Sequence, residues 1–347
     1  MESTTNKLAK TGGVNTLDVS QVSAPFREEI RSKVLELWAQ KQIKPLLVGL
    51  LAHGDASAKK YADWTSRACR ADGIEFDLRE CHPEELESQL AKANEDAKVH
   101  GIMIYYPCFG AQPSFYGGSM DDYLRDSVSV EKDVEGLCST YRRNLYSNVR
   151  YLPWLDNGKP SPVQCLLPCT PLAIVKILEH LKVYDSNKPV GDRLSGTTIT
   201  VVNRSEIVGR PLAAMLANDG AHVMSVDIDS VYGMQRGKMT KAVDATTTQA
   251  CVEKSSVVIL GVPTKDFKLN CEWLKRSGQE RVIVVNVSHF KNIDEAALYE
   301  ANPNAVYVPL VGQVTVAMLE RNLLRLIDSF VGKDIKVVEA GGRITRL

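Results

Sequence analysis

The first third of the chain alternates between apolar runs of strand length and stretches with helical spacing. Apolar runs lie at residues 44–52, 73–81 and 101–107, and helical stretches lie at 26–42, 61–69 and 83–96. Pro107 ends the third run, as expected for a residue that cannot donate a hydrogen bond to a sheet. Since the order is βαβαβ, the pattern predicts parallel strands joined by helical crossovers.

A polar, aperiodic stretch occupies the middle of the chain. Residues 108–165 are rich in Gly, Pro, Tyr and Asn, so we expect functional loops there. The next helix, within 167–184, should begin with Thr170 as its cap and Pro171 in its first turn. Its buried face is predicted to hold Leu172, Val175, Leu178 and Leu181.

The second half of the chain repeats the alternation. Residues 185–196 are typical of a domain boundary, and residues 232–250 are typical of an insertion loop. The predicted elements are a strand, loop, helix and strand at 197–227, buried strands at 255–263 and 281–288, and an amphipathic helix at 314–330.

Length and charge narrow the class of protein. With 347 residues, of which 44% are apolar, the chain can fill two cores. Lys and Arg together number 42, as do Asp and Glu, so no basic surface indicates nucleic acid or an anionic membrane. Small molecules are therefore the expected partners.

The cysteines and the N-terminus indicate a cytoplasmic protein with free thiols. Eight cysteines form no C-x-x-C pair and no zinc-like pattern with the six histidines, so no metal site is predicted. Residues 1–20 contain no apolar core of a signal peptide. No stretch approaches the roughly 18–20 apolar residues of a membrane span.

The sequence NRSEIVGRP at 203–211 lies between a predicted strand and a predicted helix. Such a loop presents backbone N–H groups and the positive end of a helix dipole to a phosphate. Gly209 would allow a close backbone approach and Ser205 would add a hydroxyl donor, although an ordinary turn explains the pattern equally well. Asp227 follows at the next strand end, where an acid accepts the ribose hydroxyls of NAD and disfavours NADP. Asp229 is the competing candidate.

Aromatic residues gather in the first half of the chain. Tyr61 and Thr65 are four residues apart and share one helix face, which core packing alone would also explain. Tyr105, Tyr106 and Pro107 come at the carboxyl end of a buried strand, where open α/β sheets bind ligands. Alternatively, one of the two adjacent rings belongs to the core and the other to the surface.

Two single residues are further candidates for site chemistry. Glu135 in EKDVEG could hydrogen-bond a heteroaromatic ring, and Gly136 would let the chain turn beside a ligand, although a solvated turn is the simpler interpretation. Cys169 in PCTP lies just before a predicted helix N-terminus, which could lower the pKa of its thiol. A buried structural thiol is the commoner fate of such a cysteine.

Taken in order, these motifs resemble the methylenetetrahydrofolate dehydrogenase/cyclohydrolase family. The resemblance covers roughly residues 45–325 and rests on DASAKKYADWTSRAC, GIMIYYP, KDVEG, LPCTPLAIVKILE, VVNRSEIVGRPLAAMLANDGAHV and LVGQVTVAML. It implies an α/β fold with an N-terminal folate-binding catalytic domain, residues 1–182 plus 314–347, to which the C-terminal helix returns. Residues 183–313 would form a Rossmann-like NAD-binding domain.

Departures from the usual residues of the family place the chain nearest to one subgroup. Bifunctional members carry a lysine four residues after the helix tyrosine and a glutamine in a Q-L-P triplet, whereas this chain has Thr65 and Tyr105. The usual aspartate of DVDG is Glu135, and PGGVGPMT is replaced by VPLVGQVT at 308–315. The chain is most similar to the fungal, cytosolic, monofunctional NAD-dependent members.

The resemblance implies a reaction and a set of site residues. Methylenetetrahydrofolate would pass a hydride to NAD, without the cyclohydrolase step that needs the missing lysine as its acid and base. On the folate side it implies Tyr61 (stacking), Thr65, Tyr105 with Pro107 (cleft wall), Glu135 (pterin anchor), Cys169 and Val311. On the cofactor side it implies Arg204, Ser205 and Gly209 (phosphates), Asp227 and Ile228 (ribose), and Gly261, Val262, Pro263, Gly312 and Thr315 (nicotinamide).

Two other functions are alternatives to this dehydrogenase activity. A bifunctional NADP-dependent enzyme is disfavoured by Thr65 and Asp227, although Arg204 matches an arginine that can meet the extra phosphate in NADP-using relatives. A catalytically silent, nucleotide-binding regulatory protein would bind NAD without turnover. The resemblance also implies a homodimer and a place in one-carbon metabolism and purine biosynthesis.

Overall fold

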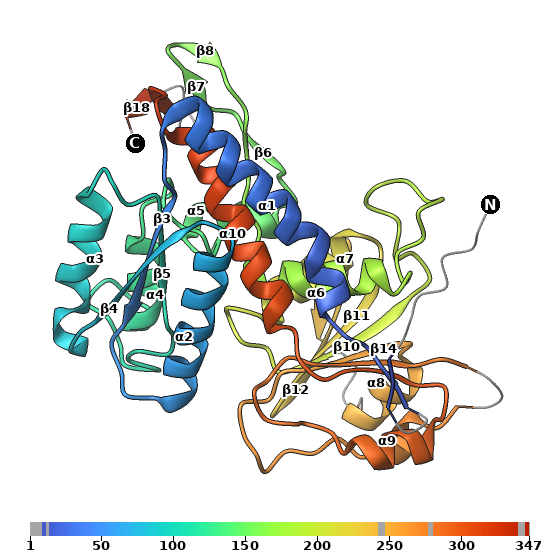
Figure 1. Cartoon of the computed structure of the whole chain (residues 1–347). Helices are drawn as coiled ribbons and strands as arrows, with labels where there is room; N and C mark the ends of the chain where they lie inside the picture. Colours follow the sequence, from blue (N-terminus) through green and yellow to red (C-terminus); the bar gives the residue numbers. More distant parts are fainter. Residues whose placement is uncertain (1–8, 12–13, 242–246, 277–279, 339–343, 347) are drawn as a thin grey trace. The chain divides into compact units, whose positions relative to one another are not determined.

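The computed structural model describes residues 9–11, 14–241, 247–276, 280–338 and 344–346. Contacts divide the chain into two compact units, each with its own principal sheet (Figure 1). The small-sheet unit comprises residues 25–169 and 316–347, and the large-sheet unit comprises residues 1–24 and 170–315. The predicted α/β class with two domains is confirmed.

The small-sheet unit is built around three parallel strands, as the βαβαβ pattern predicts. Strand β3 (Leu46–Leu51) lies between β4 (Glu75–Glu80) and β5 (Gly101–Ile104). Helix α2 (Ala56–Ala71) leads from β3 to β4, while the 3-10 turn η1 (Pro83–Glu85) and helix α3 (Leu86–Glu95) lead from β4 to β5. Right-handed crossovers in opposite directions put their helices on opposite faces, so α2 and α3 enclose the sheet (Figure 1).

Helices from the two ends of the chain lie side by side in the small-sheet unit. They are α1 (Ser20–Lys41) and α10 (Gly312–Phe330) (Figure 1). An ion pair of 3.0 Å joins Arg321 of α10 to Glu29 of α1. Leu323 packs against β5, where a Cβ on Gly101 would lie 2.7 Å from its Cδ1. The predicted return of the last helix to the first part of the chain is confirmed.

Residues 108–165 contain two helices, so the prediction of loops is wrong in part. Helix α4 spans Met120–Ser127 and α5 spans Ser139–Tyr146. Each covers about two turns, which is too short for an apolar period to show. The other elements are short: β6 (Tyr151–Leu152), β7 (Leu155–Asp156), β8 (Lys159–Pro160) and β9 (Val163–Gln164), with β17 (Ile335–Val338) and β18 (Ile344–Arg346) from the tail.

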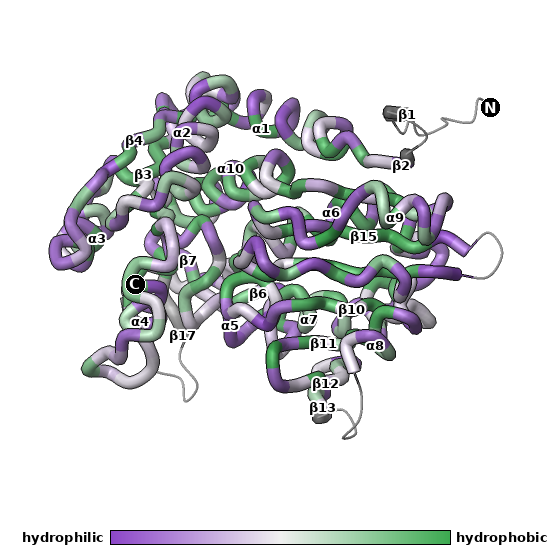
Figure 2. Tube along the Cα trace, turned by 90° about the horizontal axis from the view of Figure 1, so that it is seen from below, coloured by the Kyte–Doolittle hydropathy of each residue, from purple (hydrophilic) through white to green (hydrophobic). Residues whose placement is uncertain are grey.

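The large-sheet unit holds a nine-stranded sheet in the order β1-β2-β16-β15-β14-β10-β11-β12-β13. Its parallel centre consists of β10 (Thr198–Val202), β11 (His222–Asp227), β14 (Val257–Leu260), β15 (Ile283–Asn286) and β16 (Val306–Val308). Apolar residues concentrate along these strands (Figure 2), as is typical of parallel sheets. The other elements are β1 (Ala9–Thr11), β2 (Val14–Thr16), α6 (Cys169–His180), α7 (Gly209–Asn218), α8 (Thr248–Lys254), η2 (Cys271–Leu274) and α9 (Glu295–Ala301).

The predicted insertion loop at 232–250 is mostly a β-hairpin, so that prediction is wrong. Strand β12 (Ser230–Gln235) runs antiparallel to β11, and β13 (Lys238–Lys241) runs antiparallel to β12. Arg236 and Gly237 at the turn have φ of 45° and 73°, as a tight two-residue hairpin turn requires. These edge strands have no fully buried face, so no apolar alternation marks them. Residues 242–246 lie outside the described residues.

The boundaries of the two units differ from those of the predicted domains. Residues 1–24 and 170–182 group with the large-sheet unit, and residues 185–196 lie inside it rather than at its start. A polar surface loop within one unit has the same composition as a linker, so composition alone does not distinguish the two. Helix α6 begins at Cys169, so Thr170 lies within it and is not its cap. The predicted face of α6 is buried, as are Ala173, Ile174 and Ile177.

A buried carboxyl pair lies where α1, α2 and α10 meet. Glu320 is 0% and Asp72 2% exposed. Arg27 and Arg31 approach the Asp72 carboxylate at 2.8 and 3.3 Å. The Glu320 carboxyl group interacts with the Asp72 carboxylate and the Cys69 thiol. Burial, followed by the charge of Asp72, raises the pKa of Glu320 well above its ordinary value of 4.5. Glu320 is therefore a neutral acid at pH values where an exposed glutamate is charged.

Glu320→Gln should stabilise the protein near pH 8 more than near pH 4. Because the folded-state pKa is raised, unfolding releases a proton, and the wild type loses stability as the pH rises from about 4.5 toward the folded pKa. Glutamine has no proton to lose. We expect a gain of at least about 1 kcal/mol near pH 8, measured by urea unfolding. Glu300→Gln, at an exposed position of α9, is the control. An equal gain at both pH values would contradict the protonated state.

Candidate active site

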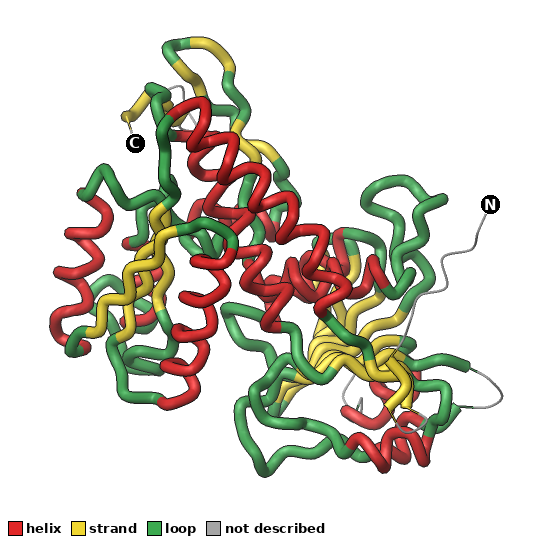
Figure 3. The backbone as a smooth tube through the Cα atoms, in the orientation of Figure 1, coloured by secondary structure: helices red, strands yellow, loops and turns green. Residues whose placement is uncertain are grey.

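Parallel pairing brings the loops after β3 and β5 to one edge of the small sheet (Figure 3). His53 follows β3 and Tyr105 follows β5. The Nε2 atom of His53 lies 2.8 Å from the Tyr105 carbonyl oxygen, and its Nδ1 accepts the Asp55 N–H at 3.4 Å. Since Nδ1 accepts, Nε2 carries the hydrogen and donates it. The bond ties the start of α2 to the strand end that carries Tyr105 and Pro107.

Tyr61, Thr65 and Tyr105 pack together in this unit. Thr65 is fully buried, and its hydroxyl donates to the Tyr61 carbonyl oxygen at 2.9 Å. The Tyr61 ring, which is partly exposed, meets the Tyr105 ring edge to face with centroids 6.1 Å apart. A Cβ on Gly49 would lie 2.8 Å from Phe76 and 3.2 Å from Tyr105, so this glycine of β3 makes room for both rings. The packing interpretation of Thr65 describes its contacts correctly.

Burial reinforces the neutral form of the two tyrosines. It raises the pKa of the Tyr105 hydroxyl, an effect that Thr65 opposes only in part. Burial also raises the pKa of Tyr61, with further contributions from Cys169, Tyr105 and Glu135. Both phenols are therefore neutral at physiological pH. Neither they nor Thr65 can accept a proton there as a base.

Glu135 projects from a tight turn that is fixed by its neighbours. The buried Asp133 carboxylate accepts the N–H groups of Glu135 at 3.1 Å and of Cys138 at 2.7 Å. Gly136 has a φ of +65°, and a Cβ on it would lie 3.0 Å from the carbonyl carbon of Leu167. The turn therefore requires glycine at this position, as predicted.

The Glu135 carboxyl group is poised between its two protonation states. One oxygen lies 3.3 Å from the Ile104 N–H at the end of β5. Burial, followed by the charge of Asp133, raises the pKa of Glu135 to about 8. The group can thus donate or accept a hydrogen bond near neutral pH, and a ring with N–H donors would favour the carboxylate.

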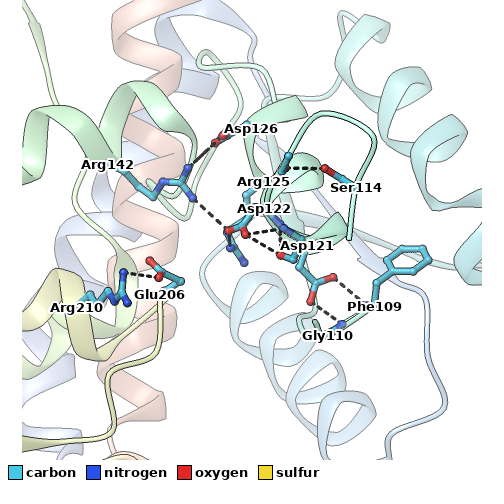
Figure 4. A network of polar contacts seen from close by, with 12 residues as sticks. Phe109, Gly110, Ser114, Asp121, Asp122, Arg125, Asp126, Arg142, Glu206 and Arg210 are labelled. Carbon is cyan, nitrogen blue, oxygen red and sulfur yellow. Dashed lines mark hydrogen bonds and ion pairs between the residues drawn. The ribbon is translucent and has the colours of Figure 1, made fainter. Parts of the chain in front are cut away.

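The loop after Pro107 is held by a carboxylate that sequence reasoning missed. The buried Asp121 side chain accepts the backbone N–H groups of Cys108, Phe109 and Gly110 at 2.9 to 3.3 Å (Figure 4). Pro107 itself is exposed. Asp121 lies in the first turn of α4, so the residue had no pattern around it that could have marked it.

A buried cation, also missed, lies beside the same loop. Arg125 is 6% exposed and forms an ion pair with Asp122 (Figure 4). Its guanidinium carbon lies 5.3 Å from the centre of the Tyr106 ring. Arg142 of α5 joins this pair through Asp122 at 4.0 Å and also binds Asp126 at 3.0 Å. Arg125 also opposes the rise in the Glu135 pKa.

Cys169 is a buried thiol. It is 6% exposed, its S–H donates to the Val134 carbonyl oxygen at 3.2 Å, and the Asn322 amide donates to its sulfur at 3.5 Å. Burial, followed by the nearby Glu135 and Asp133 carboxyls, raises the pKa of this thiol well above its ordinary value. The hypothesis of a lowered pKa is therefore wrong, because desolvation outweighs the start of α6.

The large sheet carries the other predicted residues at one edge. The loop after β10 holds Arg204, Ser205 and Gly209, and β11 ends at Asp227 as predicted; Gly261, Val262 and Pro263 follow β14, and Val311, Gly312 and Thr315 follow β16. These strands are parallel, so their carboxyl ends lie at the same edge (Figure 3). The chain passes from β10 to β11 on one side and later crosses to β14 on the other side of β10. The strand order therefore reverses at β10, and such a switch point is where doubly wound sheets bind ligands.

Glycine is required where α7 begins. A Cβ on Gly209 would lie 2.0 Å from the Asn203 carbonyl oxygen. Asn203 has a φ of +90°, and its side chain accepts the Ser205 N–H at 2.8 Å. The Ser205 hydroxyl oxygen accepts the N–H groups of Val208 at 3.3 Å and Gly209 at 3.2 Å. Its own hydrogen can then be donated to a ligand, as the sequence-based hypothesis needs.

Arg204 is tied to the hairpin. It donates to the Ser225 and Ser230 hydroxyls at 3.1 and 2.9 Å and to their carbonyl oxygens at 2.7 and 3.0 Å. Its guanidinium also lies 4.4 Å from the centre of the Tyr232 ring. All four of these bonds go to serine residues, and Asp227 acts only as a nearby charge.

The remaining predicted residues differ in exposure. Ile228, at the tip after Asp227, is 94% exposed, whereas Val311 and Thr315 are buried. The Thr315 hydroxyl donates to the Val311 carbonyl oxygen at 3.2 Å. Val262 is held by Asn292, which sequence reasoning missed: this buried amide accepts the Val262 N–H at 2.9 Å and donates to its carbonyl oxygen at 3.0 Å.

Over the described ranges of the chain, no group of three or more His, Cys, Asp or Glu side chains is arranged to hold a metal ion. Among the described helices, none combines the length and apolarity needed to cross a membrane. The eight cysteines are free thiols.

Family models match most of the chain. The model "Tetrahydrofolate dehydrogenase/cyclohydrolase, catalytic domain" matches residues 17–135, and the "NAD(P)-binding domain" model of the same family matches residues 168–330. The chain belongs to the tetrahydrofolate dehydrogenase/cyclohydrolase family. The first model therefore covers the Tyr61, Tyr105 and Glu135 cluster, and the second covers the loops at Arg204, Gly261 and Gly312.

Relatives within the family match almost end to end. A methylenetetrahydrofolate dehydrogenase (NAD+) of Schizosaccharomyces pombe is 43% identical, with 96% of this chain and 100% of the relative covered. One of Dictyostelium discoideum is 42% identical, with 90% and 94% covered. The solved structure of the NAD-dependent 5,10-methylenetetrahydrofolate dehydrogenase of Saccharomyces cerevisiae has a TM-score of 0.79 and 41% identity, covering 90% of this chain and 96% of that one.

Cys169 should resist alkylation in the folded protein. Its thiol is buried and its pKa is raised, so little thiolate forms at pH 8 and iodoacetamide has no access to it. Cys81, which is partly exposed, should react first. Peptide mass spectrometry after timed alkylation measures both, and unfolded protein, in which all cysteines react, is the control. Equal rates for Cys169 and Cys81 would contradict this account of the site.

Proposed function

We propose that the protein oxidises 5,10-methylenetetrahydrofolate to 5,10-methenyltetrahydrofolate with NAD, and that it lacks cyclohydrolase activity. The observation that carries the proposal is the cluster of Tyr61, Thr65 and Tyr105. It offers an aromatic surface within reach of the Glu135 charge but has a packed threonine where an acid–base group would stand. Relatives at 42% and 43% identity that are named as NAD-dependent dehydrogenases support the reaction.

Folate binding is assigned to the small-sheet unit. The partly exposed Tyr61 ring would stack on the substrate, and the Glu135 carboxyl would hydrogen-bond the pterin. Tyr105 and the exposed Pro107 would form the wall of the site. We propose Val311 as a further substrate-binding residue; it belongs to the large-sheet unit. These contacts hold the substrate in place, which is the main requirement of hydride transfer.

The hydride step needs no strong acid or base from the protein. The carbon that bridges N5 and N10 loses a hydride, and the two nitrogens stabilise the resulting cation. The nicotinamide ring supplies the hydride acceptor when NAD is bound. The residues of this chain contribute alignment and exclusion of water, and neither contribution requires an ionisable group at position 65.

Hydrolysis of the methenyl product has a different requirement. A water molecule must lose a proton as it attacks the cation. The Thr65 hydroxyl already donates to the Tyr61 carbonyl oxygen, and the Tyr105 phenol is kept neutral by burial. Because no base is present at these two positions, the methenyl product should leave the site unhydrolysed.

The large-sheet unit fits a dinucleotide at its carboxyl edge. Gly209 keeps the backbone clear at the start of α7, and Ser205 can donate to a phosphate. Asp227, with Ile228, would receive the ribose hydroxyls. Gly261, Val262, Pro263, Gly312 and Thr315 would lie at the nicotinamide end. None of these residues needs to be titratable.

Cys169, in the small-sheet unit, is a structural thiol near the site, because it is buried and burial raises its pKa.

NAD is favoured over NADP because Arg204 is already engaged. Four hydrogen bonds hold it to Ser225 and Ser230, so a ribose 2′-phosphate would have to break them. The same phosphate would also face the Asp227 carboxylate, and like charges repel. Arg204, whose match to NADP-using relatives favoured NADP, is thus better explained as a residue that joins β11 to β12.

We further propose that the protein acts as a homodimer in the cytoplasm, in one-carbon metabolism that supplies purine biosynthesis, and binds no nucleic acid. Free thiols and a net charge of zero are consistent with these assignments.

With methylenetetrahydrofolate, purified protein should reduce NAD at least about a hundredfold more efficiently than NADP, as kcat/KM. Asp227→Ser should narrow this ratio because it removes both the ribose acceptor and the repulsion, and Asp229→Ser is the matched control that should leave it unchanged. Steady-state kinetics with both cofactors measure the ratios. A preference for NADP would contradict the cofactor assignment, and binding of NAD without turnover would favour the silent regulatory protein.

A further inference from the structure

One buried side chain joins the two backbone segments that flank Glu135. Asn322, from α10, is 0% exposed. Its Nδ2 donates to the carbonyl oxygen of Val134 at 2.9 Å and to that of Leu167 at 3.0 Å. These partners lie 188 and 155 residues away in the sequence. A single amide therefore fixes the distance between the turn at Glu135 and the chain that leads into Cys169.

The Val134 carbonyl oxygen receives a second bond from the same region. The Cys169 S–H donates to it at 3.2 Å, so both of its lone pairs are used. On the other side of Glu135, Gly136 packs so closely on Leu167 that a Cβ would lie 3.0 Å from its carbonyl carbon. The backbone on either side of Glu135 is thus held against one segment, and Asn322 bonds to both parts.

We propose that Asn322 is a positioning residue for Glu135, acting through Val134 and Leu167 rather than by touching the substrate. The inference rests on the proposed function, in which Glu135 anchors the pterin. When the amide is lost, two buried carbonyl oxygens lose a donor, and the turn can shift by a fraction of an ångström. A displaced anchor weakens substrate binding, whereas NAD binding, which does not involve Glu135, is unaffected.

The chain contains a matched control for the purely structural part of this role. Asn302 is also buried, and its Nδ2 likewise bridges two carbonyl oxygens, of Leu274 at 3.2 Å and Glu280 at 3.3 Å. It belongs to the large-sheet unit. Asn302→Ala removes the same kind of bridge without disturbing the Glu135 turn.

The test compares KM and kcat for four proteins: wild type, Asn322→Ala, Asn322→Asp and Asn302→Ala. Asn322→Ala should raise KM for methylenetetrahydrofolate about tenfold while KM for NAD changes less than about twofold. Asn302→Ala should change neither KM by more than about twofold. Asn322→Asp should be worse than Asn322→Ala, because it keeps the side-chain size but sets an acceptor against two carbonyl oxygens. A packing role would give the opposite order.

Two further measurements show whether a change in KM arises from misfolding of a variant or from failure of the proposed function. The urea midpoint of each variant shows whether it is folded. If Asn322→Ala does not fold, Asn322→Ser takes its place. Serine keeps one hydrogen-bond donor, so this variant should show an intermediate rise in KM. Equal KM values for the Asn322 and Asn302 variants would overturn the inference. A wild type that binds tetrahydrofolate without turnover would contradict only the proposed function, and the affinities measured by calorimetry would then replace KM. A wild type that neither binds nor reacts would overturn both.

Discussion

Parallel strand pairing is the constraint on which the proposed site depends. Parallel neighbours must be joined by crossovers, so all their carboxyl ends lie at one edge. In the small-sheet unit this places the loops after β3 and β5 together, and the 2.8 Å bond from His53 to the Tyr105 carbonyl oxygen locks them. In the large-sheet unit the same rule gathers the loops that carry Arg204, Gly261 and Gly312. The loops within each unit are therefore close in space although they are distant in sequence.

In the small-sheet unit, packing rather than charge holds Tyr61, Thr65 and Tyr105 together. A short side chain at position 65 and a large ring at position 105 fill one volume, and Gly49 on the next strand leaves room for the ring. The Thr65 hydroxyl donates its hydrogen bond within its own helix, to the Tyr61 carbonyl oxygen. This arrangement is stable without an ionisable group, whereas a lysine there would require a partner to avoid a buried, unpaired charge. The chemistry of position 65 and the packing of position 105 therefore have to change together.

Much of the fold could be predicted because long, periodic segments carry their own signal. The βαβαβ order and the strand end at Asp227 follow from such segments, whereas the return of α10 was implied by the family resemblance. The two-turn helices α4 and α5 and the exposed hairpin at 230–241 are too short or too polar to show a period. The buried polar residues that hold the site in shape, Asp121, Asn292 and Asn322, were missed for another reason. Each acts on the backbone of a distant segment, and no local pattern reports such a contact.

The proposed site carries out hydride transfer and does not catalyse hydrolysis of the methenyl product. The most direct measurement adds preformed methenyltetrahydrofolate to the protein, without NAD, and follows its ultraviolet absorbance at neutral pH against a buffer blank. We expect the same slow decay in both samples, because Thr65 and Tyr105 offer no base. Decay that quickens in proportion to the protein concentration, with formyltetrahydrofolate as the product, would contradict it.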